Sequence, residues 1–427
     1  MKVLVVGGGG REHALCWKLV QSPELEKLWC APGNPGIARY AETVPIRVDE
    51  IQALADFAAD QAVDLTVVGP ELPLSLGIVD EFQERGLRVF GPSAKAAELE
   101  SSKVFAKEFM QRHGIPTARF EIAHTAEEAT AAVDRLGLPV VLKADGLAAG
   151  KGVLILHQQE ELAPALATFF DERRFGSAGD RVVVEACLSG EEVSMIALAD
   201  GRRLLPMAAS KDYKRIGDGD KGPNTGGMGS HSPSGVLGGD LAAKIFDDVM
   251  QPALEGMASE NRPLVGVLYA GLMLTAEGPS VLEFNVRLGD PEAQSVLLRL
   301  EDDLLPALAA GARGQFESER LRFRREAAAC VVLANRGYPG KPESGDAIEG
   351  IEAAEARPGV EVFHAGTASV DGRVVASGGR VLNVCSVGAD LAEALRNAYL
   401  AAAEIRWPSK IFRNDIGRRV LERVSAE

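Results

Sequence analysis

Short apolar runs alternate with amphipathic segments over roughly the first hundred residues. The apolar runs are Lys2–Val6, Leu28–Ala31, Leu65–Val68 and Leu87–Phe90, and the segments between them with helical periodicity are Arg11–Val20, Ile51–Ala59 and Ile78–Arg85. Runs such as V-L-V-V and L-T-V-V are almost continuously apolar, as the strands of a parallel sheet covered on both faces require. The pattern therefore predicts a doubly wound α/β domain over residues 1 to about 100.

The pattern changes at Ser101. A predicted helix, Lys103–His113, ends at Gly114 with Pro116 beyond it, and strands and helices then mix irregularly. Within this part, residues of about 120–190 form a compact α+β stretch that we expect to be a mobile subdomain. We expect the second domain to span 101–325. The run A-A-A-C-V-V-L-A then opens a small α+β domain, 326–427, with glycine turns and a helix at Leu391–Ile405.

Composition places this α/β and α+β multidomain chain among ordinary folded proteins. Hydrophobic residues make up 46% and charged residues 25% of its 427 residues. Its five cysteines show no C-x-x-C spacing, so neither a zinc site nor a disulfide framework is indicated, and a reducing compartment fits best. No signal segment or membrane-length apolar run is present, which predicts a cytoplasmic protein that does not bind membranes. A net charge of −15 argues against a nucleic-acid partner.

The first glycine-rich segment is G-G-G-G-R-E-H-A, between the first predicted strand and the first helix. Backbone N–H groups at such a turn can bind a phosphate. The dinucleotide pattern G-x-G-x-x-G, however, has Glu12 or His13 where its third glycine belongs, and W-C-A-P ends the second strand without a ribose-binding acid. This disfavours a nicotinamide-dependent oxidoreductase and leaves a phosphate site or a plain tight turn. Similar turns at Gly33, Gly69 and Gly91 would line the same crevice.

The second glycine-rich segment, K-A-D-G-L-A-A-G-K-G-V, lies between two predicted strands. It is not a Walker A loop, because only three residues separate Gly146 from Gly150 and Gly152 follows Lys151. A glycine turn that carries a lysine at its tip is suited to closing over nucleotide phosphates as a lid. The alternative is an ordinary exposed hairpin.

The run V-L-E-F-N-V-R carries the strongest chemical signal. Strict alternation would put Leu282, Phe284 and Val286 on one face of a strand and Glu283, Asn285 and Arg287 on the other. A carboxylate and an amide oxygen on one face can share a hard cation such as Mg²⁺. The arginine beside them is suited to a phosphate or carboxylate. A solvent-facing edge strand is the alternative, but the following L-G-D-P-E adds Asp290 and Glu292 at once.

A third glycine-rich segment, Lys211–Ser230, is too long for an idle connection. Its run N-T-G-G-M-G has many backbone amides without bulky side chains around them. We expect this run to wrap around a small anionic ligand, and a disordered surface loop is the alternative.

Together with F-R-N-D-I-G near the C-terminus, these motifs resemble those of the phosphoribosylamine–glycine ligases, over nearly the whole chain. The resemblance implies a doubly wound N-terminal domain, an ATP-grasp core with a lid subdomain, and a small C-terminal α+β domain. It implies a reaction of de novo purine biosynthesis in which glycine is joined to 5-phosphoribosylamine through glycyl phosphate. ATP would be converted to ADP and phosphate with Mg²⁺, or Mn²⁺, as the metal.

The resemblance also implies roles for individual residues. At ATP it places Lys103, Lys143, Gly150, Lys151 and Gly152 (phosphates), Glu185 and the main chain through Leu188 (adenine), and Glu192 (ribose). Glu283 and Asn285 become the metal ligands, and Arg287 lies beside the transferring phosphoryl group. Glycine is assigned to Asp212, Asp290 and the loop Asn224, Thr225, Gly226, Gly227, Met228 and Gly229. Phosphoribosylamine is assigned to Gly9, Gly10, Arg11 and Glu71.

Two alternatives remain open beside this resemblance. Another ATP-grasp ligase of nucleotide synthesis, using a different small carboxylic acid, would share the lid and the metal strand but not the pair N-T-G-G-M-G and R-L-G-D-P-E. A nucleotide sensor would bind ATP without turnover, and the intact set of lysines and carboxylates argues against it. We expect a monomer that acts on small molecules.

Overall fold

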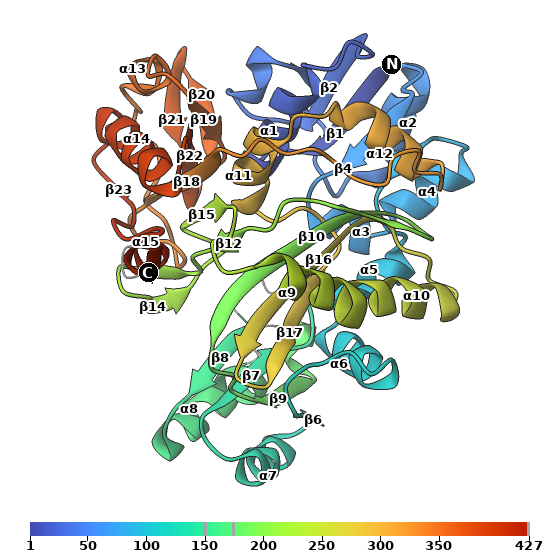
Figure 1. Cartoon of the computed structure of the whole chain (residues 1–427), viewed down its shortest axis with the longest axis vertical. Helices are drawn as coiled ribbons and strands as arrows, with labels where there is room; N and C mark the ends of the chain where they lie inside the picture. Colours follow the sequence, from blue (N-terminus) through green and yellow to red (C-terminus); the bar gives the residue numbers. More distant parts are fainter. Residues whose placement is uncertain (148–151, 173–175, 425–427) are drawn as a thin grey trace.

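The structure is a computed structural model in which residues 1–147, 152–172 and 176–424 are described. In Figure 1 the N-terminal and C-terminal parts lie side by side at the top of the molecule. A long antiparallel sheet runs beneath them, and a smaller lobe extends from that sheet at the bottom. The expected combination of α/β and α+β parts is confirmed.

The N-terminal part is a parallel sheet with helices around it. Its strand order is β3 (Glu42–Thr43), β2 (Lys27–Pro32), β1 (Lys2–Gly7), β4 (Leu65–Val68) and β5 (Val89–Phe90). The helices are α1 (Gly10–Leu19), α2 (Ile51–Asp60), α3 (Glu71–Ser75), α4 (Ile78–Glu84) and α5 (Ala94–Ser101), with a 3₁₀ turn at Ile37–Arg39. Because all strands are parallel, their carboxyl ends meet at one edge. The sequence pattern missed α3 and α5, which begin directly after the turns at Gly69 and Gly91; Ser93 caps α5 by accepting from the N–H of Ala96.

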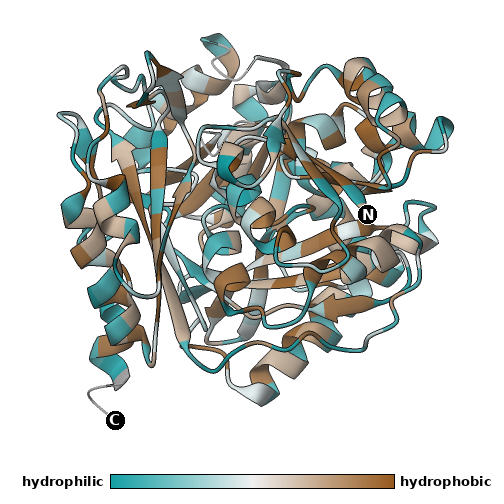
Figure 2. Ribbon diagram, turned by 90° about the horizontal axis from the view of Figure 1, so that it is seen from above, coloured by the Kyte–Doolittle hydropathy of each residue, from teal (hydrophilic) through white to brown (hydrophobic). Residues whose placement is uncertain are grey.

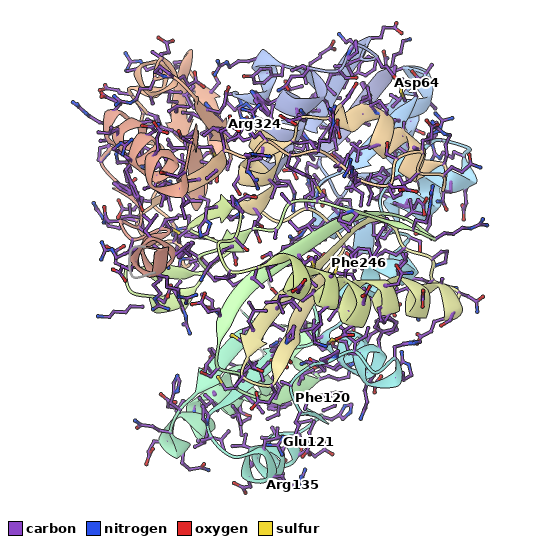
Figure 3. All side chains as sticks on the ribbon, in the orientation of Figure 1. Asp64, Phe120, Glu121, Arg135, Phe246 and Arg324 are labelled. Atoms are coloured by element: carbon purple, nitrogen blue, oxygen red, sulfur yellow. The ribbon has the colours of Figure 1, made fainter. Side chains whose placement is uncertain are left out.

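The lower lobe is an antiparallel sheet in the order β6 (Phe120–Ala123), β9 (Val182–Ala186), β7 (Val140–Ala144) and β8 (Val153–Leu156). Two helices, α7 (Ala126–Leu136) and α8 (Leu162–Leu166), share a separate apolar core with it. Short turns of helix follow at Gln159–Glu161, Ala167–Asp171 and Gly176–Gly179. Figure 3 labels Phe120, Glu121 and Arg135 in this lobe, where Glu121 and Arg135 form a surface ion pair.

The central sheet has the order β11 (Leu204–Pro206), β10 (Glu191–Asp200), β16 (Val265–Thr275) and β17 (Gly278–Asn285). Around it lie α6 (Lys103–Arg112), α9 (Gly239–Ile245), a π-helical turn (Phe246–Met250), α10 (Gln251–Ser259) and α12 (Leu304–Ala312), whereas α11 (Glu292–Arg299) packs against α1. Its apolar side chains join those of the N-terminal part in common cores. The two parts are therefore packed as one body.

The C-terminal sheet is antiparallel, in the order β12 (Lys211–Asp212), β15 (Gly229–Ser232), β18 (Ala327–Asn335), β22 (Arg380–Gly388) and β19 (Val360–His364), and β23 (Lys410–Ile411) also pairs with β18. Its further elements are α13 (Ile351–Glu355), α14 (Leu391–Glu404), α15 (Arg418–Val424) and the hairpin β20 (Thr367–Val370)–β21 (Arg373–Ala376). Strands β12 and β15 come from the glycine-rich segment far upstream. That segment is thus anchored in the C-terminal sheet.

The F-R-N-D-I-G motif holds the rest of the same segment, the hairpin β13 (Arg215–Gly217)–β14 (Lys221–Asn224). Arg413 is 1% exposed and donates to Asp415, to Asp220 (2.9 Å) and to the carbonyl oxygen of Arg215 (3.1 Å). Figure 2 shows apolar strands inside the molecule and hydrophilic positions on the outer helices. No helix among the described residues is both long and apolar enough to cross a membrane.

Candidate active site

Glu283, near the end of β17, lies between two lysines. Its Oε1 is 3.3 Å from Nζ of Lys214, and its Oε2 is 3.9 Å from Nζ of Lys103 at the start of α6. Burial raises the pKa of the Glu283 carboxyl, but the neighbouring lysines, Lys214 first, outweigh burial and hold that pKa well below its usual range. The carboxylate is therefore ionised at any physiological pH.

A β-bulge in β17 corrects the strict alternation predicted for this strand. Val281 pairs with Leu272 and Glu283 pairs with Gly271, so Leu282 stands between them without a partner on β16. Val281 is 0% exposed and belongs to the core, whereas Leu282, expected there, is only half-buried. Phe284 and Val286 are in the core as predicted. The extra residue of the bulge shifts the phase of the strand, which turns Glu283 toward the lysines.

A second carboxylate, Glu185 on β9, is shared by two lysines. Its Oε1 lies 2.5 Å from Nζ of Lys143, and its Oε2 contacts Nζ of Lys107. Lys143 also donates to the carbonyl oxygen of Leu282 at 2.9 Å. The carboxylate of Glu185 is thus fully engaged inside the protein, and its assignment to adenine stays a prediction.

Arg287 follows β17 and links Asn285, predicted as a metal ligand, with Glu71, assigned to phosphoribosylamine. Its Nη2 is 3.0 Å from Oε1 of Glu100, and its Nε is 3.4 Å from Oε2 of Glu71. Nη2 also donates to Oδ1 of Asn285 at 3.2 Å. Arg287 is thereby fixed beside Asn285, the second predicted metal ligand, with Glu71 as its neighbour on the other side.

Asp212 lies in an acidic part of the site. Burial, with Glu292 and Glu192 nearby, raises the pKa of Asp212 to about 8, although Lys214 opposes the shift. Glu292 is 3% exposed and accepts a hydrogen bond from the hydroxyl of Tyr269 at 2.8 Å. Asp212 therefore carries a proton near neutral pH, and a bound cation such as an ammonium would favour its ionised form.

The loop N-T-G-G-M-G lies against the L-G-D-P-E turn, and Arg380 of β22 joins the two. Nη1 of Arg380 donates to the carbonyl oxygens of Gly226 (2.7 Å) and Asp290 (2.5 Å), and Nη2 is 3.3 Å from Oδ2 of Asp290. Gly227 has φ +113°, and a Cβ there would lie 2.4 Å from Cδ of Pro291. The glycine is therefore required by this close approach.

The glycine turn before α1 lies next to Asp290 as well. A Cβ on Gly9 would be 3.6 Å from Oδ2 of Asp290, and one on Gly10 would be 2.6 Å from Nε2 of Gln294. Arg11 donates to the carbonyl oxygen of Leu288 at 3.0 Å. The N–H of Gly9, however, already donates to Oε2 of Glu12 at 2.6 Å, so the predicted phosphate cradle cannot use this group.

The remaining predicted residues are less informative. Gly150 and Lys151 lie outside the described residues. Gly152 is buried, and its carbonyl oxygen accepts from the N–H of Ala144 at 2.8 Å. Leu188 is half-buried after β9, and the Oε2 of Glu192 is 3.6 Å from Nζ of Lys214.

A cavity of ≈ 20 Å³ between Arg11, Phe90 and Arg287 is walled mainly by apolar side chains. It has room for about one water, so the substrates have to bind elsewhere.

Comparison with known proteins identifies the family of this site. Residues 1–100, 101–293 and 328–419 match, in turn, the N domain, the ATP-grasp (A) domain and the C domain of phosphoribosylglycinamide synthetase. The chain is 48% identical over 426 residues to the phosphoribosylamine–glycine ligase of Brucella melitensis biotype 1, covering 100% of each chain. The chain belongs to this family. The phosphoribosylamine–glycine ligase of Escherichia coli O157:H7 is 47% identical to it, over 99% of each chain.

Solved structures agree with this family and with the predicted ATP-grasp fold. A phosphoribosylamine–glycine ligase from Thermotoga maritima has a TM-score of 0.83 at 36% identity, covering 97% of this chain and 100% of that chain. An N5-carboxyaminoimidazole ribonucleotide synthetase from the same organism has a TM-score of 0.65 at 18% identity, covering 96% and 99%, and is therefore similar in fold alone. The resemblance read from the motifs is confirmed.

Sequence reasoning missed several members of the site in this family. Lys214 was detectable, since it stands two residues after Asp212 and the two would share a face in an extended segment. Lys107 was detectable as a polar residue on the otherwise apolar face of α6. Glu100 and Arg380 had no signal: neither lies in a motif, and only the tertiary fold brings them to Arg287 and Asp290.

Proposed function

We propose that this chain joins the carboxylate of glycine to the amine of 5-phosphoribosylamine and converts ATP to ADP and phosphate, as a step of purine biosynthesis. The names of its relatives, phosphoribosylamine–glycine ligases at up to 48% identity over the whole chain, support the substrates. A carboxylate is a poor acyl donor, because the group that would leave is too basic. Attack of glycine on the γ-phosphate gives glycyl phosphate, from which the ribosylamine nitrogen displaces phosphate.

The observation that carries this proposal is the gathering of cations around Glu283. Lys103, Lys143 and Lys214 come from three separate segments, and all lower the pKa of this one carboxylate. Phosphoryl transfer needs little covalent chemistry from a protein; it needs reactants held in line and negative charge neutralised. Lysines fixed on separate elements supply both requirements for the phosphates of ATP.

The donor set of β17 fits a hard divalent cation. Glu283 offers a carboxylate and Asn285 an amide oxygen, and such oxygens together with phosphates suit Mg²⁺ or Mn²⁺. The described residues contain no group of three or more His, Cys, Asp or Glu side chains that could hold a metal by themselves, so phosphate oxygens have to complete the coordination. When bound, the metal would neutralise charge on the phosphates during transfer.

Glycine and phosphoribosylamine are assigned to neighbouring parts of the site. Asp212, Asp290 and the Asn224–Gly229 loop would hold glycine, whose ammonium favours an ionised Asp212. Gly9, Gly10, Arg11 and Glu71 would hold phosphoribosylamine near Asp290. The closeness of Gly9 to Asp290 supports this arrangement, since a Cβ added to Gly9 would lie 3.6 Å from Oδ2 of Asp290.

The remaining features of the proposal follow from the sequence. We expect the chain to work in the cytoplasm as a monomer, with residues 1–100, 101–325 and 326–427 as its domains and about 120–190 as the lid. A net charge of −15 supports small-molecule substrates rather than nucleic acid.

An omission assay tests the proposed function. Phosphate release from MgATP is measured with glycine and freshly prepared phosphoribosylamine, and then with each component left out. We expect sustained turnover only with all components, and ADP as the nucleotide product. Production of AMP and pyrophosphate, or turnover that does not depend on glycine, would refute the proposal.

A further inference from the structure

The bulge in β17 leaves Leu282 without a partner residue on β16. In a regular strand Glu283 would share the face of Val281, which is 0% exposed in the core. The extra residue, Leu282, changes this phase and turns Glu283 toward Lys214. A bulge is an irregular piece of backbone, so its geometry depends on what its polar groups bind. Two side chains from outside the sheet bind them here.

The first of these side chains is Lys143, which donates to the carbonyl oxygen of Leu282 at 2.9 Å. The second is Thr117, whose hydroxyl donates to the carbonyl oxygen of Val281 at 2.7 Å. The N–H of Val281 also donates to the carbonyl oxygen of Pro116 at 2.7 Å. The backbone on both sides of the bulge is therefore held by groups of the lower lobe and of the segment that leads into it.

Lys107 lies behind both of these contacts. Its ammonium donates to Oγ1 of Thr117 at 2.7 Å and pairs with Oε2 of Glu185, whose Oε1 pairs with Lys143. Phe120, labelled in Figure 3, offers its ring at 5.7 Å from the same ammonium. The ammonium of Lys107 thus orients Thr117, which binds β17 directly, and Glu185, which holds Lys143 at its contact with β17.

Lys107 cannot itself be a substrate contact in this arrangement. Its side chain is 3% exposed, and its ammonium is already surrounded by a carboxylate, a hydroxyl and an aromatic face. Pairing a buried lysine does little more than offset the cost of removing its charge from water, so stability alone is a weak reason for a lysine at this position. The ring of contacts from Lys107 to the bulge supplies one.

We propose that Lys107 is a positioning residue that fixes the bulge of β17 through Thr117 and through Glu185 and Lys143. In this way it sets the direction of the Glu283 carboxylate. The inference rests on the proposed function, since it gives Lys107 its role through the predicted metal ligand.

Lys107→Met, with Lys18→Met as matched control, tests this inference. Lys18 is also buried, 6% exposed, and its ammonium also binds a backbone carbonyl, that of Leu300 at 2.6 Å, but it lies between α1 and the end of α11. We expect Lys107→Met to lower kcat roughly tenfold or more and to raise the Mg²⁺ concentration for half-maximal rate by a similar factor, because a displaced ligand weakens both. The same weakening should appear, without turnover, in Mn²⁺ titrations of the protein with ADP followed by electron paramagnetic resonance. Lys18→Met should change none of these values.

Thr117→Val provides a variant that keeps the lysine pair and the volume of the side chain. It removes only the hydroxyl route, so we expect a shift of the Mg²⁺ dependence in the same direction as for Lys107→Met. In the double variant the combined fold change in the Mg²⁺ dependence should be smaller than the product of the two single fold changes, because both substitutions act on one bulge. If Lys107→Met does not fold, the Mg²⁺ dependence of Thr117→Val alone tests whether the bulge is held in this way.

The outcomes separate this inference from the proposed function. A wild-type protein without glycine-dependent phosphate release would refute the proposed function. If the wild type is active but Lys107→Met and Thr117→Val show the same Mg²⁺ dependence as Lys18→Met, the positioning role of Lys107 is overturned and the proposed function stands.

Discussion

Lys214 and Glu283 form an ion pair inside the site, with Nζ and Oε1 3.3 Å apart. Glu283 and Asp212 raise the pKa of Lys214 well above its ordinary value against the effect of burial. In the free protein this lysine supplies positive charge at the predicted metal position. We expect this ammonium to contact the phosphates once nucleotide and metal are bound.

We therefore expect Lys214→Met to lower kcat by roughly a hundredfold, since one fixed cation near developing phosphate charge contributes about 3 kcal/mol. Lys221→Met, on the exposed strand β14 of the adjoining hairpin, is the control. Steady-state phosphate release measures both. Equal rates for the two variants would exclude Lys214 from the chemical step.

Glu283→Gln is expected to abolish most turnover, because it keeps the shape of the side chain but removes a charge that faces the metal. The loss should be several kcal/mol in kcat/KM, with partial recovery at high Mg²⁺ if metal binding is the main defect. Glu277→Gln, exposed at the turn between β16 and β17, should behave as wild type. Phosphate release across a Mg²⁺ titration is the measurement. Wild-type rates for Glu283→Gln at limiting Mg²⁺ would remove it from the site.

Arg380→Met is expected to weaken use of glycine or phosphoribosylamine without changing the KM for ATP. Arg380 binds the carbonyl oxygens of Gly226 and Asp290, so its loss separates the two acceptor loops but leaves Lys103 and Lys143 in place. Charged hydrogen bonds of this kind correspond to roughly a tenfold to hundredfold effect. Arg373→Met, exposed on β21, is the control. A selective rise in the KM for ATP would contradict this role.

Folding stability is expected to fall as the pH falls from about 6.5 to about 4. Burial lowers the pKa of His364 to about 4, with Arg39 adding to the effect, whereas an unfolded histidine titrates near 6.5. The unfolded chain therefore binds more protons in this window, and His364 contributes a loss of about 3 kcal/mol, complete below pH 4. Urea unfolding of His364→Asn across this range should show a flatter slope than wild type. His124→Asn, which removes an exposed histidine, should leave the slope unchanged.

How much of this structure the sequence could predict depended on whether the deciding contacts were local. Runs such as Lys2–Val6 and Arg11–Val20 are periodic, and they correspond to β1 and α1 within a residue or two. The side of β17 that carries Glu283 was also predicted. The bulge at Leu282 was not, because it depends on side chains of Thr117 and Lys143 that are far away in sequence.

The contacts that the C-terminal part makes with the site could not be predicted from the sequence for the same reason. Strand β15 pairs with β18 across about a hundred residues of sequence, and Gly229 and Ser230 show no strand pattern of their own. The motif F-R-N-D-I-G was noticed, but nothing in its letters indicates that Arg413 holds the β13–β14 hairpin. Contacts of this kind are a property of the fold, and sequence periodicity carries no record of them.

If glycine is activated as an acyl phosphate, one of its carboxylate oxygens has to leave with the released phosphate. Glycine labelled with ¹⁸O in its carboxylate is supplied with MgATP and phosphoribosylamine. When the carboxylate attacks the γ-phosphorus, one glycine oxygen becomes the bridging atom, and it leaves with phosphate when the amine displaces it. We expect one ¹⁸O in each released phosphate. Label in AMP, or phosphate without label during full turnover, would contradict it.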